Sequence, residues 1–511
     1  MAFSVEFLDK SRALETLDRL YEIFSANMSG LGVSWAKDEW TGEILNGLQK
    51  PQRQLLLLKD GRELAGFFLY YVNQGKLMME EIQFLPRYFG SGLFEALYSY
   101  LMDVVPPDTR SVEAYVHRVN AKSRGILAHL GLTEVPDGSD SEILKYRSEM
   151  NALRARYGEG ARLEGVSVGE GYDVFCGKGL LDVCGTLIRR VWNGKRCVVA
   201  TDGTVGPLYL ERAVKSLENA GMEVYSFAFP AGEAQKTMNT LSGVLEAFAS
   251  AGLSRADLAI ALGGGVVGDI TGFAAGCYMR GMDFVQLPTT LLSAVDASVG
   301  GKTAVNLQAG KNLAGLFHQP RLVICDTELL STLSAPALAE GAAEALKTGV
   351  VGDGELFGLL ENGIVFQNLP EIIQRCVRVK AKIVSEDERD TGERHVLNLG
   401  HTYGHALETL SGYGISHGRA VAIGLCMAAR AAVSMGDMSA EDGKRILRAA
   451  AACGLPTECP FSPDEVAKKA YLDKKRLGGE LKLVIPKAIG KCGIRAIPAE
   501  RFSDYARAGM K

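Results

Sequence analysis

ADLAIALGGGVVGDITGFAA, residues 256–275, is an apolar run that leads directly into three glycines and then into a helical pattern. A strand that turns into a helix in this way is typical of an α/β layer. Glycine lets the backbone approach a ligand closely, and the free amides at a helix start favour a phosphate. For the glycines taken alone, a tight turn with close helix packing is an equally good interpretation.

The same alternation continues on both sides of that stretch. Short apolar runs that end at Gly, Asp or Pro predict mostly parallel strands at Arg196–Thr201, Glu223–Phe229, Leu258–Leu262, Asp283–Leu287 and Leu322–Cys325. Ligands of open α/β sheets bind at the carboxyl ends of the strands. Asp202, Asp269, Thr289 and Thr290 are therefore expected to gather where a dinucleotide would lie.

The chain of 511 residues is too long for one ordinary domain, and its pattern changes along its length. Residues 1–150 mix helix and strand signals, and the polar residues 151–170 predict a linker. Residues 171–333 form the α/β zone, and residues 334–511 are mainly helical. Outside the α/β zone we predict a helix at Ala13–Ala26 and extended segments at Gln54–Lys59, Leu64–Val72, Leu481–Ile485 and Gly493–Ile497.

Composition excludes several classes of protein. Apolar residues make up 47% and charged residues 23%, as in ordinary globular proteins. The net charge of -4 offers no basic excess for nucleic acid or an anionic membrane, and no apolar run reaches membrane-spanning length. The N-terminus lacks the features of a secretory signal, and the ten cysteines are scattered without a CxxC pair. We therefore expect reduced thiols in a cytoplasmic protein.

Four of the seven histidines fall within 23 positions of the helical zone. His401 and His405 are four residues apart on a predicted helix and share a face, and His417 follows a short loop. Imidazole together with a carboxylate suits zinc or a similar ion, and Glu344 in EGAAEALKTG is the predicted carboxylate, with Lys347 facing the same way. A lone histidine is commonly a packed or surface residue, but three within 17 positions favour a metal site.

A second group of polar residues interrupts SAVDASVGGKTAVNLQAGKNLAG, which begins at Ser293. Asp296, Lys302, Lys311 and Asn312 stand close together there among glycines. We predict a loop whose lysines bind phosphate as point charges. Solvated surface lysines are the commoner alternative, but the surrounding residues are small and apolar rather than polar.

From Gly171 onward the chain resembles the 3-dehydroquinate synthase family of sugar-phosphate cyclases. The resemblance rests on matching segments in matching order: PAGEAQKT, ALGGGVVGD, LPTTLLSAVDASVGGKTAVN, GKNLAG, EGAAEALKTG, ERHVLNLGHTYGHALE, HGRAVAIG and LDKKRLGG. It implies an NAD-binding α/β domain followed by a helical domain that binds metal and substrate.

The resemblance also implies roles for individual residues. It implies that Glu344, His401 and His417 bind Zn or Co. It implies NAD contacts from Asp202, Glu233, Lys236, Gly264, Gly265, Asp269, Thr289, Thr290, Lys311 and Thr332. It implies substrate contacts from Arg280, Asp296, Lys302, Asn312, Lys347, Lys380, Arg394, Asn398, His405 and Lys474, and catalytic roles for His405, Lys302, Lys347, Arg394 and Asn398. Within that pattern His405 is the candidate for proton transfer, and Arg280 would reach the neighbouring site of a homodimer.

The implied substrate is a small phosphorylated sugar acid, 3-deoxy-D-arabino-heptulosonate 7-phosphate, and the implied products are 3-dehydroquinate and phosphate. NAD would oxidise a ring hydroxyl beside a Lewis-acid metal, phosphate would leave by elimination, the hydride would return, and the ring would open and close again by an aldol step. Asn312, Lys380, Arg394 and Asn398 match the dehydroquinate-forming branch rather than an inosose or valiolone synthase. A metal-dependent polyol or glycerol-phosphate dehydrogenase is the alternative. Asp390 stands where relatives often carry Glu, and its role is open.

Residues 1–150 lie outside that resemblance. LPRYFGSGLFEALYSYL carries Arg87, Gly90 and Gly92 at the start of an amphipathic helix, where backbone amides suit a pyrophosphate. The segment is similar to the acetyl-CoA loop of GNAT acyltransferases, and VHRVNAKSRGILAHLGLTEV is similar to a later GNAT strand-helix-turn. Leu127 stands where many GNAT enzymes place a tyrosine acid, and loss of a general acid slows proton transfer. A GNAT-like fold kept for binding or packing is therefore the alternative to an active acyltransferase.

Overall fold

The computed structural model describes residues 3–8, 13–28, 35–50, 52–61, 63–88, 93–106, 109–130, 132–135, 142–150, 153, 162–474 and 480–510. The chain divides into two compact units, Met1–Ala161 and Arg162–Lys511. Among the described helices, none is long and apolar enough to cross a membrane. The ten cysteines all lie within the described residues and form no disulfide, as the sequence predicts.

The described residues of the first unit form a seven-stranded sheet with the order β1-β2-β3-β4-β5-β7-β6. Its strands are β1 (Phe3–Phe7), β2 (Arg53–Asp60), β3 (Glu63–Asn73), β4 (Lys76–Phe84), β5 (Ser111–His117), β6 (Thr133–Val135) and β7 (Ile143–Glu149). Its helices are α1 (Ala13–Met28), α2 (Lys37–Leu48), α3 (Leu93–Val104) and α4 (Ala121–His129). The predicted helix and the two predicted strands of this zone are confirmed as α1, β2 and β3.

The first unit buries both faces of its central strands. Leu56 and Phe68 join a core that includes residues of α3, whereas their neighbours Leu57 and Phe67 join a second core with residues of α1 and α2. Side chains alternate between the two faces of a strand, so apolar residues at successive positions, as in LLLL and FFLYY, are needed to fill both cores. The continuous apolar runs of β2 and β3 therefore follow from their central place in the sheet.

Strands β4 and β5 are the parallel pair of this sheet, and the other described neighbours run antiparallel. They pair through residues 76–79 of β4 and 111–114 of β5. β4 continues to Phe84 and β5 to His117 without further pairing between them in the described residues. The carboxyl ends of the two strands are therefore separated.

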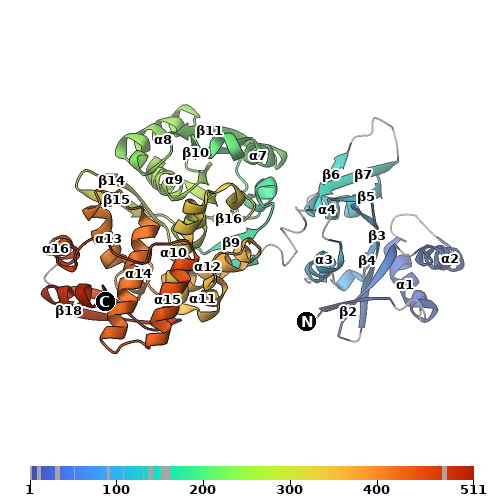
Figure 1. The fold of residues 1–511 in the computed structure, drawn as a ribbon. Helices are drawn as coiled ribbons and strands as arrows, with labels where there is room; N and C mark the ends of the chain where they lie inside the picture. The colour runs from blue at the N-terminus through green and yellow to red at the C-terminus, as the bar shows by residue number, and fades with distance from the viewer. Residues whose placement is uncertain are drawn as a thin grey trace. The chain divides into compact units, whose positions relative to one another are not determined.

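The second unit begins with another seven-stranded sheet among its described residues, in the order β11-β10-β12-β13-β16-β9-β8. The strands are β8 (Arg162–Val166), β9 (Tyr172–Gly177), β10 (Arg196–Asp202), β11 (Glu223–Phe229), β12 (Leu258–Gly263), β13 (Asp283–Pro288) and β16 (Leu322–Asp326). The helices α6 (Cys184–Ile188), α7 (Gly206–Asn219), α8 (Met238–Ser250) and α9 (Gly265–Cys277) accompany them (Figure 1). All five predicted strands of the α/β zone are confirmed, and their pairs in this sheet are parallel.

Two segments of this unit differ from the sequence-based prediction. β8 lies within the predicted linker and pairs antiparallel with β9, so the sheet begins before Gly171. Its short, polar sequence RLEGV lacks the apolar run that marks the buried strands. The predicted phosphate-binding loop is instead a two-stranded hairpin, β14 (Lys302–Leu307) and β15 (Gly310–Phe317), because its small residues allow close antiparallel pairing.

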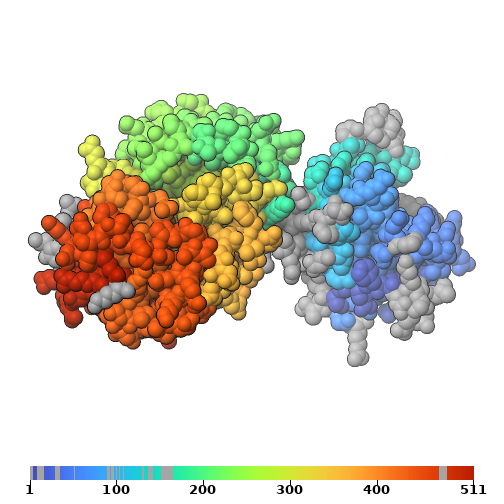
Figure 2. Space-filling view, in the orientation of Figure 1, coloured from blue at the N-terminus to red at the C-terminus, as the bar shows by residue number. Residues whose placement is uncertain are grey.

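The rest of the second unit is mainly helical, as predicted. Its helices are α10 (Ala335–Gly352), α11 (Gly354–Leu360), α12 (Leu369–Glu386), α13 (His401–Leu410), α14 (His417–Ser434), α15 (Ala440–Ala452), α16 (Pro463–Lys474) and α17 (Phe502–Ala508). The predicted extended pair is confirmed as the hairpin β17 (Glu480–Ala488) and β18 (Lys491–Pro498). Figure 2 shows this orange and red helical part packed directly against the green α/β part.

Helices α10 and α14 lie at the centre of the helical part and are buried along most of their length. Their sequences are rich in Ala and Gly, which lets neighbouring helices approach closely. A Cβ added at Gly424 of α14 would lie 2.1 Å from the carbonyl oxygen of Gly400, the residue that precedes α13. Since α13 begins at His401, the position of that histidine depends on the absence of a side chain at Gly424.

The substitution Gly424→Ala is expected to lower the free energy of unfolding by about 1–3 kcal/mol, the usual cost of overpacking. Because the added methyl displaces Gly400, we also expect the variant to retain less metal at the histidine cluster. Denaturant unfolding and metal content measure the two effects. The matched control is Gly358→Ala on α11, where the new Cβ meets nothing within 4 Å and Ala favours the helix. Equal stability of the two variants would contradict the packing argument.

Candidate functional site

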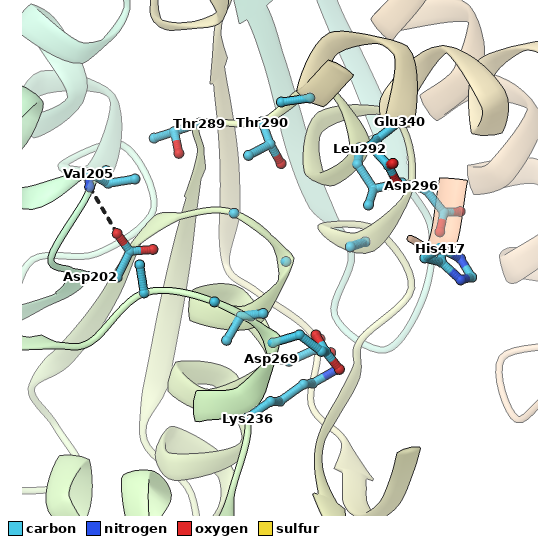
Figure 3. Close-up of a pocket in the computed structure, with 18 of the residues that line it drawn as sticks. Asp202, Val205, Lys236, Asp269, Thr289, Thr290, Leu292, Asp296, Glu340 and His417 are labelled. Carbon is cyan, nitrogen blue, oxygen red and sulfur yellow. Dashed lines mark hydrogen bonds and ion pairs between the residues drawn. The ribbon is translucent and has the colours of Figure 1, made fainter. Parts of the chain in front are cut away.

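A cavity of about 610 Å³ lies where the parallel strands of the second unit end. Figure 3 shows Asp202 at one end of the labelled residues and His417 at the other, with Thr289, Thr290 and Asp269 between them. All ten residues predicted to contact NAD line this cavity: Asp202, Glu233, Lys236, Gly264, Gly265, Asp269, Thr289, Thr290, Lys311 and Thr332. Five predicted substrate residues line it as well: Asp296, Lys302, Asn312, Lys380 and Arg394.

The Asp202 end of the cavity is shaped by strand-to-helix turns. Asp202 ends β10, and its Oδ1 accepts hydrogen bonds from the backbone amides of Thr204 at 2.8 Å and Val205 at 2.9 Å, which fixes the turn into α7 (Figure 3). Gly264 precedes α9, and a Cβ there would lie 3.1 Å from the Thr290 side chain. Gly264 and Gly265 thus lie at the cavity wall and Gly264 also packs closely on Thr290, so both interpretations of these glycines fit the structure.

Lys236 stands at the middle of the cavity wall. Its ammonium forms an ion pair with Asp269 and donates a hydrogen bond of 2.6 Å to Oδ1 of Asn312 (Figure 3). Burial raises the pKa of Asp269 to about 6, although Lys236 acts in the opposite direction. The lysine thus joins α9 to the β14–β15 hairpin, and both elements carry cavity-lining residues.

The predicted anion-binding residues are paired with carboxylates or carbonyls. Lys380 on α12 donates to Oδ1 of Asp296 at 2.8 Å and to its backbone oxygen at 2.6 Å. Lys302 forms an ion pair with Asp390, the residue at which this chain departs from the common pattern. Arg394 is buried and donates to the carbonyl oxygens of Glu388 at 2.6 Å and Gly300 at 3.1 Å. Burial lowers the pKa values of Lys380 and Arg394, as expected for cations removed from water.

Glu344, His401 and His417 form a group whose ligand atoms all lie within 4.8 Å of one another. Oε1 of Glu344 is 3.6 Å from Nε2 of His401 and 3.3 Å from Nε2 of His417. Glu344 is fully buried, and neither of its carboxylate oxygens accepts a hydrogen bond from the residues that the structure describes, although Lys347 forms an ion pair with it. Two imidazoles and a buried carboxylate whose oxygens lack hydrogen-bond donors among the described residues are a ligand set that suits zinc or a similar ion.

The two histidines of this group have opposite electrostatic surroundings. Burial lowers the pKa of His401 to about 3, so its imidazole is neutral and keeps a free lone pair. Burial also lowers the pKa of His417, but the carboxylates of Glu344 and Glu408 outweigh it and raise the pKa to about 10. A cation that binds between these residues would therefore displace a proton from His417, as is usual for metal sites.

The structure does not bring every predicted residue to the cavity. Lys347 is buried behind it against Glu344, and Asn398 contacts His395 at 3.4 Å. His405 is exposed, with its ring 5.4 Å from that of His401. Arg280 is exposed and precedes β13, so it lies near the amino end of that strand, whereas the cavity borders the carboxyl ends of the strands. Lys474 is the last residue of α16, and its side chain lies outside the described residues.

Two carboxylates near the histidine cluster are absent from the sequence-based prediction. Glu340 lines the cavity and accepts hydrogen bonds from the amide of Gly418, at 2.7 Å, and from the hydroxyl of Ser416. Glu408 is buried between Lys311 and His417. Their sequence positions could have indicated them, because residues three or four apart share a helix face. Glu340 precedes Glu344 by one helical turn, and Glu408 follows His405 by three residues.

Only part of the predicted acyl-CoA loop of the first unit lies within the described residues. Gly90 and Gly92 lie outside the described residues. Arg87 forms an ion pair with Glu63, and its guanidinium lies 5.1 Å from the centre of the Tyr88 ring. Leu127 is buried in the core beside the sheet, which suits an apolar packing residue.

Known protein families and structures match the second unit. The family model for the 3-dehydroquinate synthase N-terminal region matches residues 226–340, and the model for its C-terminal region matches residues 341–476. Two solved structures share its fold over 68% of this chain and 99% of theirs. One is a 2-deoxy-scyllo-inosose synthase complexed with carbaglucose-6-phosphate, NAD+ and Co2+, with 25% sequence identity and a TM-score of 0.61. The other is the 2-epi-5-epi-valiolone synthase of Streptomyces hygroscopicus with NAD+ and Zn2+ bound, with 27% sequence identity and a TM-score of 0.61.

Two curated relatives are more similar in sequence. A 3-dehydroquinate synthase of Desulforamulus reducens is 44% identical over 332 residues, which cover 63% of this chain and 92% of the relative. A 3-dehydroquinate synthase of a Shewanella species is 45% identical over 339 residues, which cover 64% of this chain and 94% of the relative. Identity at this level over nearly the whole of both relatives shows that the chain belongs to the 3-dehydroquinate synthase family.

Proposed function

We propose that the second unit converts 3-deoxy-D-arabino-heptulosonate 7-phosphate to 3-dehydroquinate and phosphate, with NAD and a divalent metal, Zn or Co. One observation carries this proposal: the ten residues predicted to contact NAD and five of those predicted to contact substrate line a single cavity that reaches His417 of the metal group. The names of the two curated relatives support the reaction. The NAD+ and Co2+ or Zn2+ in the two solved relatives support the cofactors.

Glu344, His401 and His417 would hold the metal, which supplies Lewis-acid polarisation of a substrate oxygen when bound. The exposed His405 stands beside this group and is the proposed proton carrier between substrate and water. Lys347 is buried against Glu344 and keeps that carboxylate ionised, which is the form that binds a metal. Its proposed role is therefore to position the metal group from behind rather than to touch the substrate, the contact that the resemblance implies.

Lys302, Lys380 and Arg394 would bind the anionic groups of the substrate. Each is already oriented by an acceptor from another segment: Asp390 for Lys302, Asp296 for Lys380 and the Gly300 carbonyl for Arg394. Fixing side chains before substrate arrives lowers the entropic cost of reaching the reactive geometry. Asn398 and Lys474 complete the proposed substrate contacts.

Phosphate release without net NADH is the result expected of the full chain with the heptulosonate phosphate and catalytic NAD. The hydride that NAD accepts returns to the same substrate, so phosphate accumulates while absorbance at 340 nm stays flat. A chelator should stop phosphate release, and added Zn or Co should restore it. Net NADH formed from a polyol or glycerol phosphate would instead support the dehydrogenase alternative. Turnover of a phosphosugar without the carboxylate would support another cyclase.

We also propose that the second unit is divided into an NAD-binding part, residues 171–333, and a metal- and substrate-binding part, residues 334–511.

A homodimer is proposed as the working form, with Arg280 reaching the partner's cavity. Two features support this role of Arg280. It is exposed at the amino ends of the parallel strands, opposite the cavity of its own chain, and both it and Met279 have positive φ angles, 70° and 48°, in an exposed turn.

For the first unit, we propose a GNAT-like fold that binds acyl-CoA. The strand order supports it, as do the parallel pairing of β4 with β5 and the end of that pairing at Met79 and Ala114 among the described residues, beyond which a pantetheine chain could lie between the two strands. Arg87, Gly90 and Gly92 would meet the pyrophosphate. The acyl acceptor is not part of the proposal, because the described residues of this unit do not define one.

Binding of acetyl-CoA to the full chain tests the first-unit proposal. Isothermal titration calorimetry in the presence of saturating NAD should give one acetyl-CoA site per chain. NAD and acetyl-CoA both contain an adenosine diphosphate group, so saturating NAD keeps acetyl-CoA out of the proposed NAD site. The variant Arg87→Ala should bind acetyl-CoA more weakly, because it removes one proposed pyrophosphate contact. Absence of heat change at saturating acetyl-CoA would contradict both an acyltransferase and an acyl-CoA sensor.

A further inference from the structure

Glu408 is a buried carboxylate that contacts two functional residues from different parts of the second unit. Its Oε1 accepts a hydrogen bond of 2.7 Å from the ammonium of Lys311 on β15. Its Oε2 lies 3.6 Å from Nδ1 of His417 at the start of α14. The side chain is only 4% exposed, so its charge is largely removed from bulk water and depends on these partners.

The two partners have different tasks in the proposed reaction. Lys311 lines the cavity and is assigned to NAD, whereas His417 is assigned to the metal. Tyr413 follows α13, and the Lys311 ammonium lies 4.7 Å from the centre of its ring. The amide of Tyr413 in turn donates to the carbonyl oxygen of Glu408 at 2.7 Å. Lys311 is thus held between an anion and an aromatic face that belong to one short segment.

The contact with His417 decides which imidazole nitrogen faces the metal group. Nδ1 lies on the side of the Glu408 carboxylate and Nε2 on the side of Glu344, at 3.6 Å and 3.3 Å from the nearest oxygens. A metal held beside Glu344 would take the lone pair of Nε2, so the ring hydrogen would stand on Nδ1, where it faces the Glu408 carboxylate as its acceptor. A carboxylate behind a ligand histidine commonly fixes the ring and raises its basicity, and its loss costs about 10- to 100-fold in metal affinity.

We propose that Glu408 is a positioning residue that orients His417 for the metal and Lys311 for NAD at the same time. The inference rests on the proposed function, because it assumes that the chain binds both groups. Its distinctive consequence is that one carboxylate affects two affinities through two separate partners. Glu408 should therefore act on metal binding with or without Lys311, but on NAD binding only through Lys311.

The test measures two dissociation constants in the absence of turnover. Apo protein of the full chain is titrated with Co2+ against a competing chelator and, separately, with NAD. The variants are Glu408→Gln, Lys311→Met and the double variant. Glu361→Gln is the matched control, because Glu361 makes a comparable ion pair with Arg445, at 2.7 Å and 2.9 Å, in the same helical part and does not line the cavity among the described residues.

Glu408→Gln is expected to weaken Co2+ binding by about 10- to 100-fold. It should also weaken NAD binding. Lys311→Met should weaken NAD binding but leave Co2+ binding nearly unchanged. In the Lys311→Met background, Glu408→Gln should again weaken Co2+ binding yet add no further loss for NAD. The visible spectrum of bound Co2+ should indicate an unchanged coordination number, because Glu408 is proposed to stand behind His417 and not to bind the ion, although its carboxylate also lies within 4.8 Å of ligand atoms of His405 and His417.

Several results would overturn the inference. Wild-type affinities in Glu408→Gln would do so, as would equal losses in Glu408→Gln and Glu361→Gln, which would indicate a general effect on stability. A lower Co2+ coordination number in Glu408→Gln would make Glu408 itself a ligand. If that variant does not fold, Glu408→Asp carries the same comparison with the charge kept and the carboxylate withdrawn. A wild-type chain that binds neither Co2+ nor NAD would refute the proposed function instead.

Discussion

The variant His417→Ala is expected to lose phosphate release from the heptulosonate phosphate and most of its bound metal. It removes one of the three proposed ligands, and the remaining pair, Glu344 and His401, cannot close a site around one ion. The loss of affinity should exceed the roughly 10- to 100-fold effect typical of an outer partner such as Glu408. Metal content by mass spectrometry and a colorimetric phosphate assay measure the two losses.

His117→Ala is the matched control for that experiment, because His117 lies in the first unit, is 47% exposed, and its side chain contacts only local partners among the described residues, the Glu142 carboxylate and the Val119 amide. The control should keep metal and activity. Full activity with one metal per chain in His417→Ala would refute the assignment of His417 as a ligand.

Lys347→Met is expected to produce the largest loss of stability among these variants, about 3–5 kcal/mol in the free energy of unfolding. The Lys347 side chain is 2% exposed, pairs with Glu344, and helps Lys380 to stabilise the charge of Asp296 at the cavity wall. Without Lys347, the Glu344 carboxylate loses its ammonium partner in a site that excludes water. Denaturant unfolding of the metal-free protein measures the cost, since a bound cation would otherwise replace the missing charge.

The double variant Glu344→Gln/Lys347→Met separates this electrostatic cost from simple loss of packing. It removes both charges, so we expect it to recover much of the stability that Lys347→Met loses, but no enzyme activity. A double variant as unstable as Lys347→Met would show that the lysine acts through its methylene chain instead.

The parallel strands of the second unit could be predicted because each is buried on both faces and therefore has an uninterrupted apolar sequence. β8 could not, because an edge strand with the sequence RLEGV needs few apolar residues and resembles a polar linker. The β14–β15 hairpin was also obscured, since its glycines and alanines are typical of a loop when the partner strand is unknown.

The site was predictable where its residues are neighbours in sequence. His401 and His405 share a helix face, and Glu344 and Lys347 are three residues apart. The partners of the anion-binding lysines were not predictable from pattern: Lys302 pairs with Asp390, which is 88 residues away. Glu408 belongs to the segment that suggested the metal site, but its role depends on Lys311, 97 residues before it. Such contacts arise only when the chain has folded.

The ion pairs of Lys302 with Asp390 and of Lys380 with Asp296 each cross from the α/β part of the second unit to the helical part. The same lysines are the proposed partners of the anionic substrate. A phosphate or carboxylate that binds these ammonium groups would share them with the protein's own carboxylates, and it would thereby weaken two of the contacts that hold the parts together. Substrate affinity and the freedom of the two parts to move against each other are, in consequence, thermodynamically linked.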